Sequence, residues 1–174
     1  ISFRSKGSKE LTNIVISPKD AICLLKRAYN TERLMDERSV LNFIGAPGNA
    51  KTSIVKQFAQ EINEERISKG LSEVMCWSLR LNQCDPTDLK GVPIYIKIGD
   101  KQFCSFASPS TIPIKGSPES AEGKFVIIHL DELPQAVPSM QNLAANIIDG
   151  VIGDHEIDLD RTMIIVSGNR KNDK

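Results

Sequence analysis

The fold of this chain is decided by residues 40–52, VLNFIGAPGNAKT. The first five residues form a short apolar run that favours a strand, and the segment Gly45–Gly48 suits the interior of neither a helix nor a strand. From Ile54 to Ile62, apolar residues then recur at three- and four-residue spacing, as on one face of a helix. The sequence therefore predicts a strand, a tight turn and a helix in that order.

The turn has the spacing of a phosphate-binding loop, G-x-x-x-x-G-K-[ST], with Ala50 in place of the last glycine. In such a loop, successive backbone N–H groups surround the phosphates at a helix N-terminus, where unpaired donors and the helix dipole favour negative charge. Lys51 is then expected to reach the β- and γ-phosphates, and the Thr52 hydroxyl to ligate Mg²⁺. Because Ala50 brings a Cβ into this tight loop, we expect its backbone to adopt an angle that a side chain tolerates. The candidate nucleotide-binding residues are Gly45, Ala46, Pro47, Gly48, Asn49, Ala50, Lys51, Thr52 and Ser53.

The alternative interpretation of these residues is an ordinary turn between a strand and a helix. Five specified positions, at roughly 7% frequency each, predict on the order of 10⁻³ chance matches in a chain of this length. The flanking strand and helix patterns are also those that the motif requires, so we prefer the phosphate-binding interpretation.

Strand and helix patterns alternate along the rest of the chain, which predicts a parallel α/β sheet. Near-continuous apolar runs at Phe125–Leu130 and Thr162–Val166 are typical of strands buried on both faces. The Ser- and Pro-rich segment Ala107–Gly123 predicts an exposed loop. The other expected elements are a helix over 17–30, a strand over 73–80, a hairpin that pairs 94–98 with 102–106, a helix over 138–148, and a small hairpin within 151–160.

Polar residues follow the two most apolar strands. Asp131 and Glu132 come directly after one of them, and in an open parallel sheet this edge binds the ligand. We expect Asp131 to hold the metal, directly or through water, and Glu132 to orient and deprotonate an attacking water. Asn169 follows the other strand, and its amide could bond a γ-phosphate or that water. It could also be a simple turn residue, since Gly-Asn pairs are common in turns.

Composition excludes several classes of protein. The 174 residues are 40% hydrophobic and 25% charged, as in an average globular domain, which disfavours a disordered chain. The 22 basic and 22 acidic side chains balance, so charge gives no support for nucleic acid or an anionic membrane surface as a partner. No apolar run approaches the roughly 18 residues of a membrane span. The four cysteines lack C-x-x-C spacing and predict reduced thiols and a cytoplasmic location, and His129 and His155 lack the partners of a zinc site.

With these elements in order, the sequence resembles the AAA+ ATPases, and within them the MoxR-type, dynein-related branch. The resemblance covers nearly the whole chain. It implies a P-loop NTPase fold, a three-layer α/β/α core with a mainly parallel sheet, small hairpin insertions and a lid beyond Lys174. The residues that carry it are GAPGNAKT at 45–52, CDPTDLKGVP at 84–93, HLDELPQAVPSMQNL at 129–143 and VSGN at 166–169.

The resemblance also implies roles for these residues. Residues 45–52 would be the Walker A loop, 125–132 the Walker B strand, and Asn169 the first sensor. Lys51, Glu132 and Asn169 would be catalytic, with Thr52 and Asp131 as metal ligands and ATP and Mg²⁺ as cofactors. Residues 92–123 would be an insertion that faces the substrate, 151–160 the hairpin before the sensor, and the segment 15–18 would lie near the adenine. An arginine finger and a second sensor would follow Lys174, so we expect a fragment that hydrolyses ATP poorly alone.

The function that the resemblance implies is an ATPase that binds ATP and ADP, forms a homo-oligomeric, hexameric ring and remodels a protein substrate or adaptor. One alternative is a nucleic-acid-linked motor, such as a helicase loader or a GTP-using restriction-type subunit, and the neutral charge counts against it. The other is a nucleotide-gated interaction module without hydrolysis, and the presence of Lys51, Asp131 and Glu132 counts against that.

Overall fold

The computed structural model of the protein describes residues 17–35, 40–46, 48 and 50–169. Among the positions singled out above, Pro47 and Asn49 of the loop and residues 15–16 lie outside the described residues.

A four-stranded sheet forms the centre of the protein. Its strands are β1 (Leu41–Ile44), β2 (Val74–Arg80), β5 (Phe125–Asp131) and β8 (Thr162–Gly168), in the spatial order β1-β8-β5-β2. All three pairings are parallel, so the carboxyl ends of the four strands meet at one edge. The prediction of an α/β fold with a parallel sheet is therefore confirmed.

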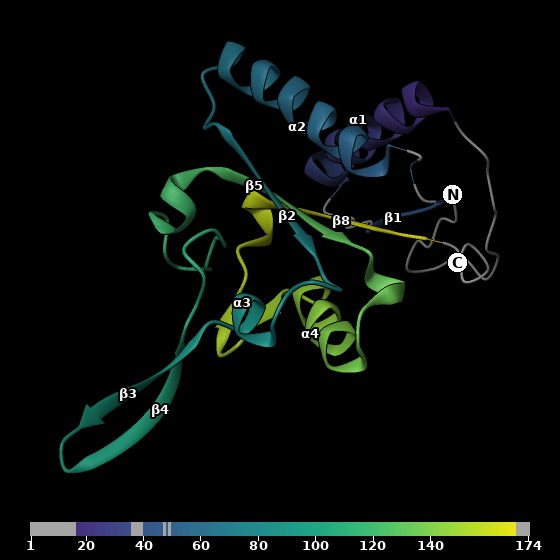
Figure 1. Ribbon diagram of the computed structural model, residues 1–174. Coiled ribbons are helices and arrows are strands. Elements are labelled where there is room, and N and C mark those ends of the chain that lie inside the picture. Colours follow the sequence, from purple (N-terminus) through teal and green to yellow (C-terminus); the bar gives the residue numbers. More distant parts are fainter. Residues whose placement is uncertain (1–16, 36–39, 47, 49, 170–174) are drawn as a thin grey trace.

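Helices cover both faces of this sheet (Figure 1). On one face, α1 (Pro18–Met35) and α2 (Lys51–Ser68) pack against alternate strand residues such as Ile127 and Ile165. On the other face, α3 (Pro86–Lys90) and α4 (Pro138–Ile148) cover the intervening residues, such as Ile128. Every residue of β5 and β8 is buried, as the continuous apolar runs predicted. No helix within the described ranges is long and apolar enough to cross a membrane.

The first helix begins as predicted and ends later. The Ser17 hydroxyl donates to Asp20 Oδ2 at 2.6 Å and accepts from the Asp20 N–H at 3.2 Å, which fixes the first turn. The helix then continues to Met35, beyond the expected end at residue 30. Residues 31–35 contain no glycine or proline, so nothing in their sequence stops a helix there.

Two hairpins lie outside the central sheet. The larger one pairs β3 (Val92–Ile98) with β4 (Lys101–Ala107) and projects from the body of the protein (Figure 1). The smaller one pairs β6 (Val151–Ile152) with β7 (His155–Glu156). A His155 ring nitrogen lies 2.8 Å from the Phe106 carbonyl oxygen, which attaches the base of the larger hairpin to the smaller one. Both hairpins were expected, and the strands of the larger one are longer than predicted.

The prediction of an exposed loop over 107–123 is wrong at Ile112, Pro113 and Ala121. Ile112 and Ala121 are almost completely buried in the core beneath α4, and a 3₁₀ turn, η1 (Ser120–Gly123), closes the segment. The Arg161 guanidinium donates to the carbonyl oxygens of Ser117 and Pro118 at 3.1 Å each. Because Arg161 binds these backbone oxygens, the segment can lie against the core in spite of its polar composition. Two further 3₁₀ turns are η2 (Leu133–Gln135) and η3 (Leu159–Arg161).

Candidate functional site

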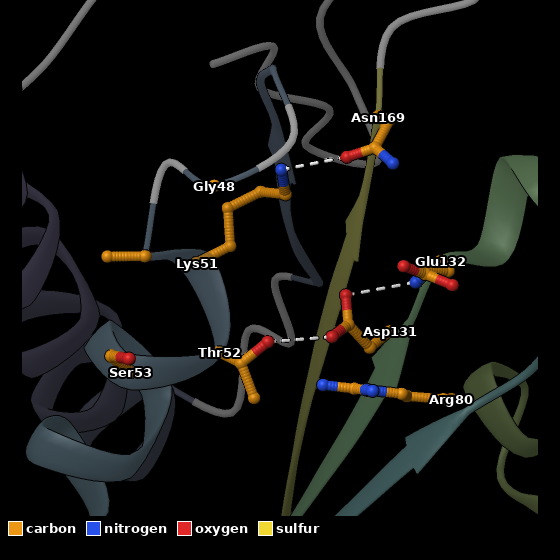
Figure 2. A pocket seen from close by; sticks show the side chains of 9 residues that line it. Gly48, Lys51, Thr52, Ser53, Arg80, Asp131, Glu132 and Asn169 are labelled. Atoms are coloured by element: carbon orange, nitrogen blue, oxygen red, sulfur yellow. Dashed lines mark hydrogen bonds between the residues drawn. The ribbon is translucent and has the colours of Figure 1, made fainter. Parts of the chain in front are cut away.

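A pocket of about 320 Å³ opens at the carboxyl edge of the central sheet, beside the first turn of α2 (Figure 2). The turn after β1 and the ends of β2, β5 and β8 supply its walls. Polyphosphate and dinucleotide ligands bind at this edge in open α/β sheets. The lining residues are Gly48, Ala50, Lys51, Thr52, Ser53, Arg80, Asp131, Glu132 and Asn169.

The Lys51 side chain crosses the pocket from the start of α2 to the end of β8. Its ammonium group donates to the carbonyl oxygens of Gly45 at 2.8 Å and Ala46 at 2.9 Å, and to Asn169 Oδ1 at 3.0 Å. The lysine and the amide, far apart in the sequence, therefore belong to one site. Gly45 and Ala46 contribute to it through their backbone oxygens.

The carboxylate of Asp131 is held by three hydrogen bonds. Its Oδ2 atom accepts from the Thr52 hydroxyl at 2.8 Å, while Oδ1 accepts from the Ser167 hydroxyl and from the Glu132 N–H at 3.0 Å. Burial alone would raise the pKa of this carboxyl, but the hydrogen bonds from Ser167 and Thr52 outweigh it, and the pKa of Asp131 is lowered from its ordinary value. Asp131 is therefore a carboxylate at neutral pH.

Behind Asp131 a hydrogen-bond chain crosses three neighbouring strands. Ser78 Oγ on β2 lies 2.8 Å from His129 Nδ1 on β5, and His129 Nε2 lies 2.8 Å from Ser167 Oγ on β8, which in turn donates to Asp131. We call Ser78, His129, Ser167 and Asp131 the polar chain. His129 and Ser167 are fully buried. Burial lowers the pKa of His129, although the neighbouring Asp131 carboxylate acts in the opposite direction, so the ring is neutral at pH 7. His129 is therefore a hydrogen-bonded histidine of the core.

Two residues of the pocket other than glycine have left-handed backbones. Ala50 has φ 51° and ψ 22°, and Glu132 has φ 59° and ψ 30°. For residues other than glycine this conformation costs roughly 1–2 kcal/mol. Ala50 therefore adopts an angle that a side chain tolerates, as expected, but at this cost, because the loop keeps the left-handed backbone that glycine prefers. Strain of this kind concentrates at functional sites.

Arg80 is the pocket residue that sequence reasoning missed. It ends β2, pairs in register with Asp131, and its side chain points toward Thr52 and Asp131 in Figure 2. Arg80 could have been selected from the sequence, because it stands at the end of a predicted strand, and the same position singled out Asp131. The order of the strands, which the sequence does not reveal, decides that Arg80 and Asp131 are neighbours.

Thr52 and Asp131 are suited to hold a magnesium ion. Both offer hard oxygen donors, and their oxygens lie 2.8 Å apart at the pocket wall. Mg²⁺ in proteins is usually held by one or two such side chains together with phosphate oxygens and water. Within the described part of the chain, no group of three or more His, Cys, Asp or Glu side chains could hold a metal ion. The pair therefore fits a cation that arrives with a phosphate ligand better than a permanently bound metal.

The chemistry of the pocket is divided between two sides. Lys51, Arg80 and the N-terminus of α2 provide positive charge, while Asp131 and Glu132 provide two carboxylates. A phosphate chain accompanied by a divalent cation matches both sides.

No protein-family model matches this chain, and no curated protein matches its sequence. The interpretation of the site therefore rests on its geometry.

Proposed function

We propose that this protein binds ATP with Mg²⁺ in the pocket described above and hydrolyses it, as a P-loop NTPase of the MoxR-type AAA+ class. The observation that carries the proposal is the meeting of Lys51, Thr52, Asp131, Glu132 and Asn169 at one pocket. Three separate segments supply these residues, and each was selected from the sequence for phosphate or metal chemistry. The helices on both faces of the parallel sheet support the three-layer fold of that class.

Five side chains of the pocket have roles in this chemistry. Lys51 neutralises the phosphates, and the N–H groups at the start of α2 bind their oxygens. Thr52 and Asp131 hold Mg²⁺, which when bound neutralises charge on the phosphate oxygens. Glu132 orients a water and accepts its proton. Asn169, already bonded to the Lys51 ammonium, donates its amide N–H to the same water or to the terminal phosphate.

The larger hairpin is the part that we propose to contact a protein substrate. Val92, Ile94, Ile96 and Ile98 alternate along β3 and so share one face, and Phe103 lies directly opposite Ile96. All five are at least 40% exposed. An exposed apolar face of this kind suits a protein partner better than a nucleic acid, which would be bound by basic residues. A ring of identical subunits that moves such hairpins on ATP hydrolysis would remodel the bound protein.

Calorimetry with Mg²⁺ and either ATP or GTP tests nucleotide binding directly. The wild-type protein is expected to bind at least one of them, and Lys51→Ala to weaken binding by about 10- to 100-fold, the value of a hydrogen bond to a charged group. Lys69→Ala, at the opposite end of α2, is the matched control and should bind as the wild type does. A wild-type protein that binds neither nucleotide would refute the proposal.

Turnover is tested separately with Glu132→Gln. This variant keeps the shape of the side chain and removes its basicity, so it should bind ATP normally and lose hydrolysis. If binding is lost as well, Glu132 has a different role from the one proposed.

A further inference from the structure

We infer that His129 and Ser167 are positioning residues, which orient Asp131 so that one carboxylate oxygen is anchored in the protein and the other faces the pocket. This inference rests on the proposed function, in which Asp131 holds Mg²⁺. It assigns a purpose to buried polar groups that the proposed reaction does not otherwise use.

The donors and acceptors of the polar chain can be ordered from Asp131 back to His129. The Asp131 carboxylate only accepts, so the Ser167 hydroxyl must donate to Oδ1. The Ser167 oxygen can then accept from His129 only if Nε2 carries the proton of the ring. The other ring nitrogen, Nδ1, lies 2.8 Å from the Ser78 hydroxyl, which connects the ring to β2. The hydrogen bonds of His129 and Ser167 therefore both point toward Oδ1 of Asp131.

The two oxygens of Asp131 consequently differ. Oδ1 accepts from Ser167 and from the Glu132 N–H, while Oδ2 accepts from Thr52, the other proposed metal ligand. The polar chain holds Oδ1 of Asp131 toward β8, so Oδ2 of the same carboxylate faces Thr52. Partners behind a metal ligand commonly fix its orientation in this way.

The position of the polar chain in the core indicates that it orients Asp131 and does not simply fill space. His129 and Ser167 project from the same sheet face as Ile127 and Ile165, which pack apolar side chains beneath α2. An imidazole and a hydroxyl can be buried there without a large cost only when they have hydrogen-bond partners, which an isoleucine would not need. The polar chain ends on Asp131, which is the buried carboxylate of the pocket and is 4% exposed.

The direction of the chain can be measured without any ligand. The protein contains two histidines, so ¹⁵N-histidine spectra of wild type and of His155→Gln assign the His129 ring. We expect Nε2 to carry a proton, which it donates to Ser167. An Nε2 without a proton would overturn the inference.

Magnesium titrations then test the purpose of the chain. Nucleotide affinity is measured by calorimetry with a non-hydrolysed ATP analogue, with and without Mg²⁺. For Ser167→Ala we expect the Mg²⁺ requirement to rise by about 10- to 100-fold, as for other residues behind a metal ligand, while affinity without Mg²⁺ stays within about twofold. Thr162→Val is the matched control, because it removes one buried hydroxyl from the opposite end of the same strand.

The histidine is tested by a pair of variants. His129→Gln can still donate from its amide to Ser167 and should restore much of the Mg²⁺ response, whereas His129→Leu cannot and should resemble Ser167→Ala. If wild type shows Mg²⁺-dependent binding and Ser167→Ala matches it, the inference fails while the proposed function stands. If wild type shows no Mg²⁺-dependent binding, the proposed function fails, and the purpose assigned to the chain fails with it.

Discussion

Replacing Ala50 by glycine should stabilise the protein. Ala50 has φ 51°, a left-handed conformation that costs an L-residue roughly 1–2 kcal/mol and costs glycine nothing. The glycine makes the unfolded chain more flexible, which costs about 0.4–1 kcal/mol. The difference predicts that Ala50→Gly raises the free energy of unfolding by about 0.5–1 kcal/mol.

The matched control is Ala145→Gly, an exposed position within α4. There the backbone is helical, so the same substitution should lower the free energy of unfolding by about 1 kcal/mol. Urea unfolding followed by the fluorescence of Trp77, the single tryptophan, measures both variants. Opposite signs at the two positions are expected. If Ala50→Gly destabilises the protein as much as Ala145→Gly does, the loop does not hold Ala50 in the left-handed region and the reasoning is wrong.

Three further substitutions or measurements test the packing outside the pocket. Gly91 has a φ of 84°, and a Cβ on it would lie 1.9 Å from a backbone oxygen of β4. Gly91→Ala should therefore lower the free energy of unfolding in urea by more than about 2 kcal/mol. Gly99→Ala, which has open space around it, should lower it by less. Burial raises the pKa of Cys76, so this thiol should react with iodoacetamide at a higher pH in the folded protein than in the urea-unfolded chain. Because the unfolded chain loses its thiol proton first, Cys76 also makes stability fall as pH rises past 9.0, and equal pH profiles for the folded and unfolded thiol would contradict this. Arg161→Met should lower the free energy of unfolding by about 2 kcal/mol, since it removes the hydrogen bonds from Arg161 to the carbonyl oxygens of Pro118 and Ser120, and protease cleavage within that segment should increase.

The local features of the site could be predicted from the sequence because each depends on neighbouring residues. The strand, turn and helix of residues 40–62 follow from apolar spacing and from the glycines of the turn. Asp131 and Asn169 were placed correctly at the ends of strands, and parallel strands bring such ends to one edge. Their meeting with Lys51 in one pocket was an expectation that the geometry supports.

The features that could not be predicted depend on which strands are neighbours. The pairing of β2 with β5 places Arg80 beside Asp131 and Ser78 beside His129, and no local pattern announces it. The segment 107–123, in which Ile112 and Ala121 are buried, is likewise contacted by Arg161, which lies far along the chain. Its polar composition predicted exposure and does not reveal this distant partner.

The position of β8 in the sheet also determines when the protein can fold during synthesis. Among the described strands, β1 pairs only with β8, and Leu41 lies opposite Ile165. At roughly 5–20 residues per second, a ribosome finishes β8 on the order of ten seconds after β1. Throughout that interval β1 has no strand to pair with, and Lys51 has no Asn169 to bind. The pocket can therefore form only after β8 emerges, and until then the apolar strand β1 is exposed to chaperones and to aggregation.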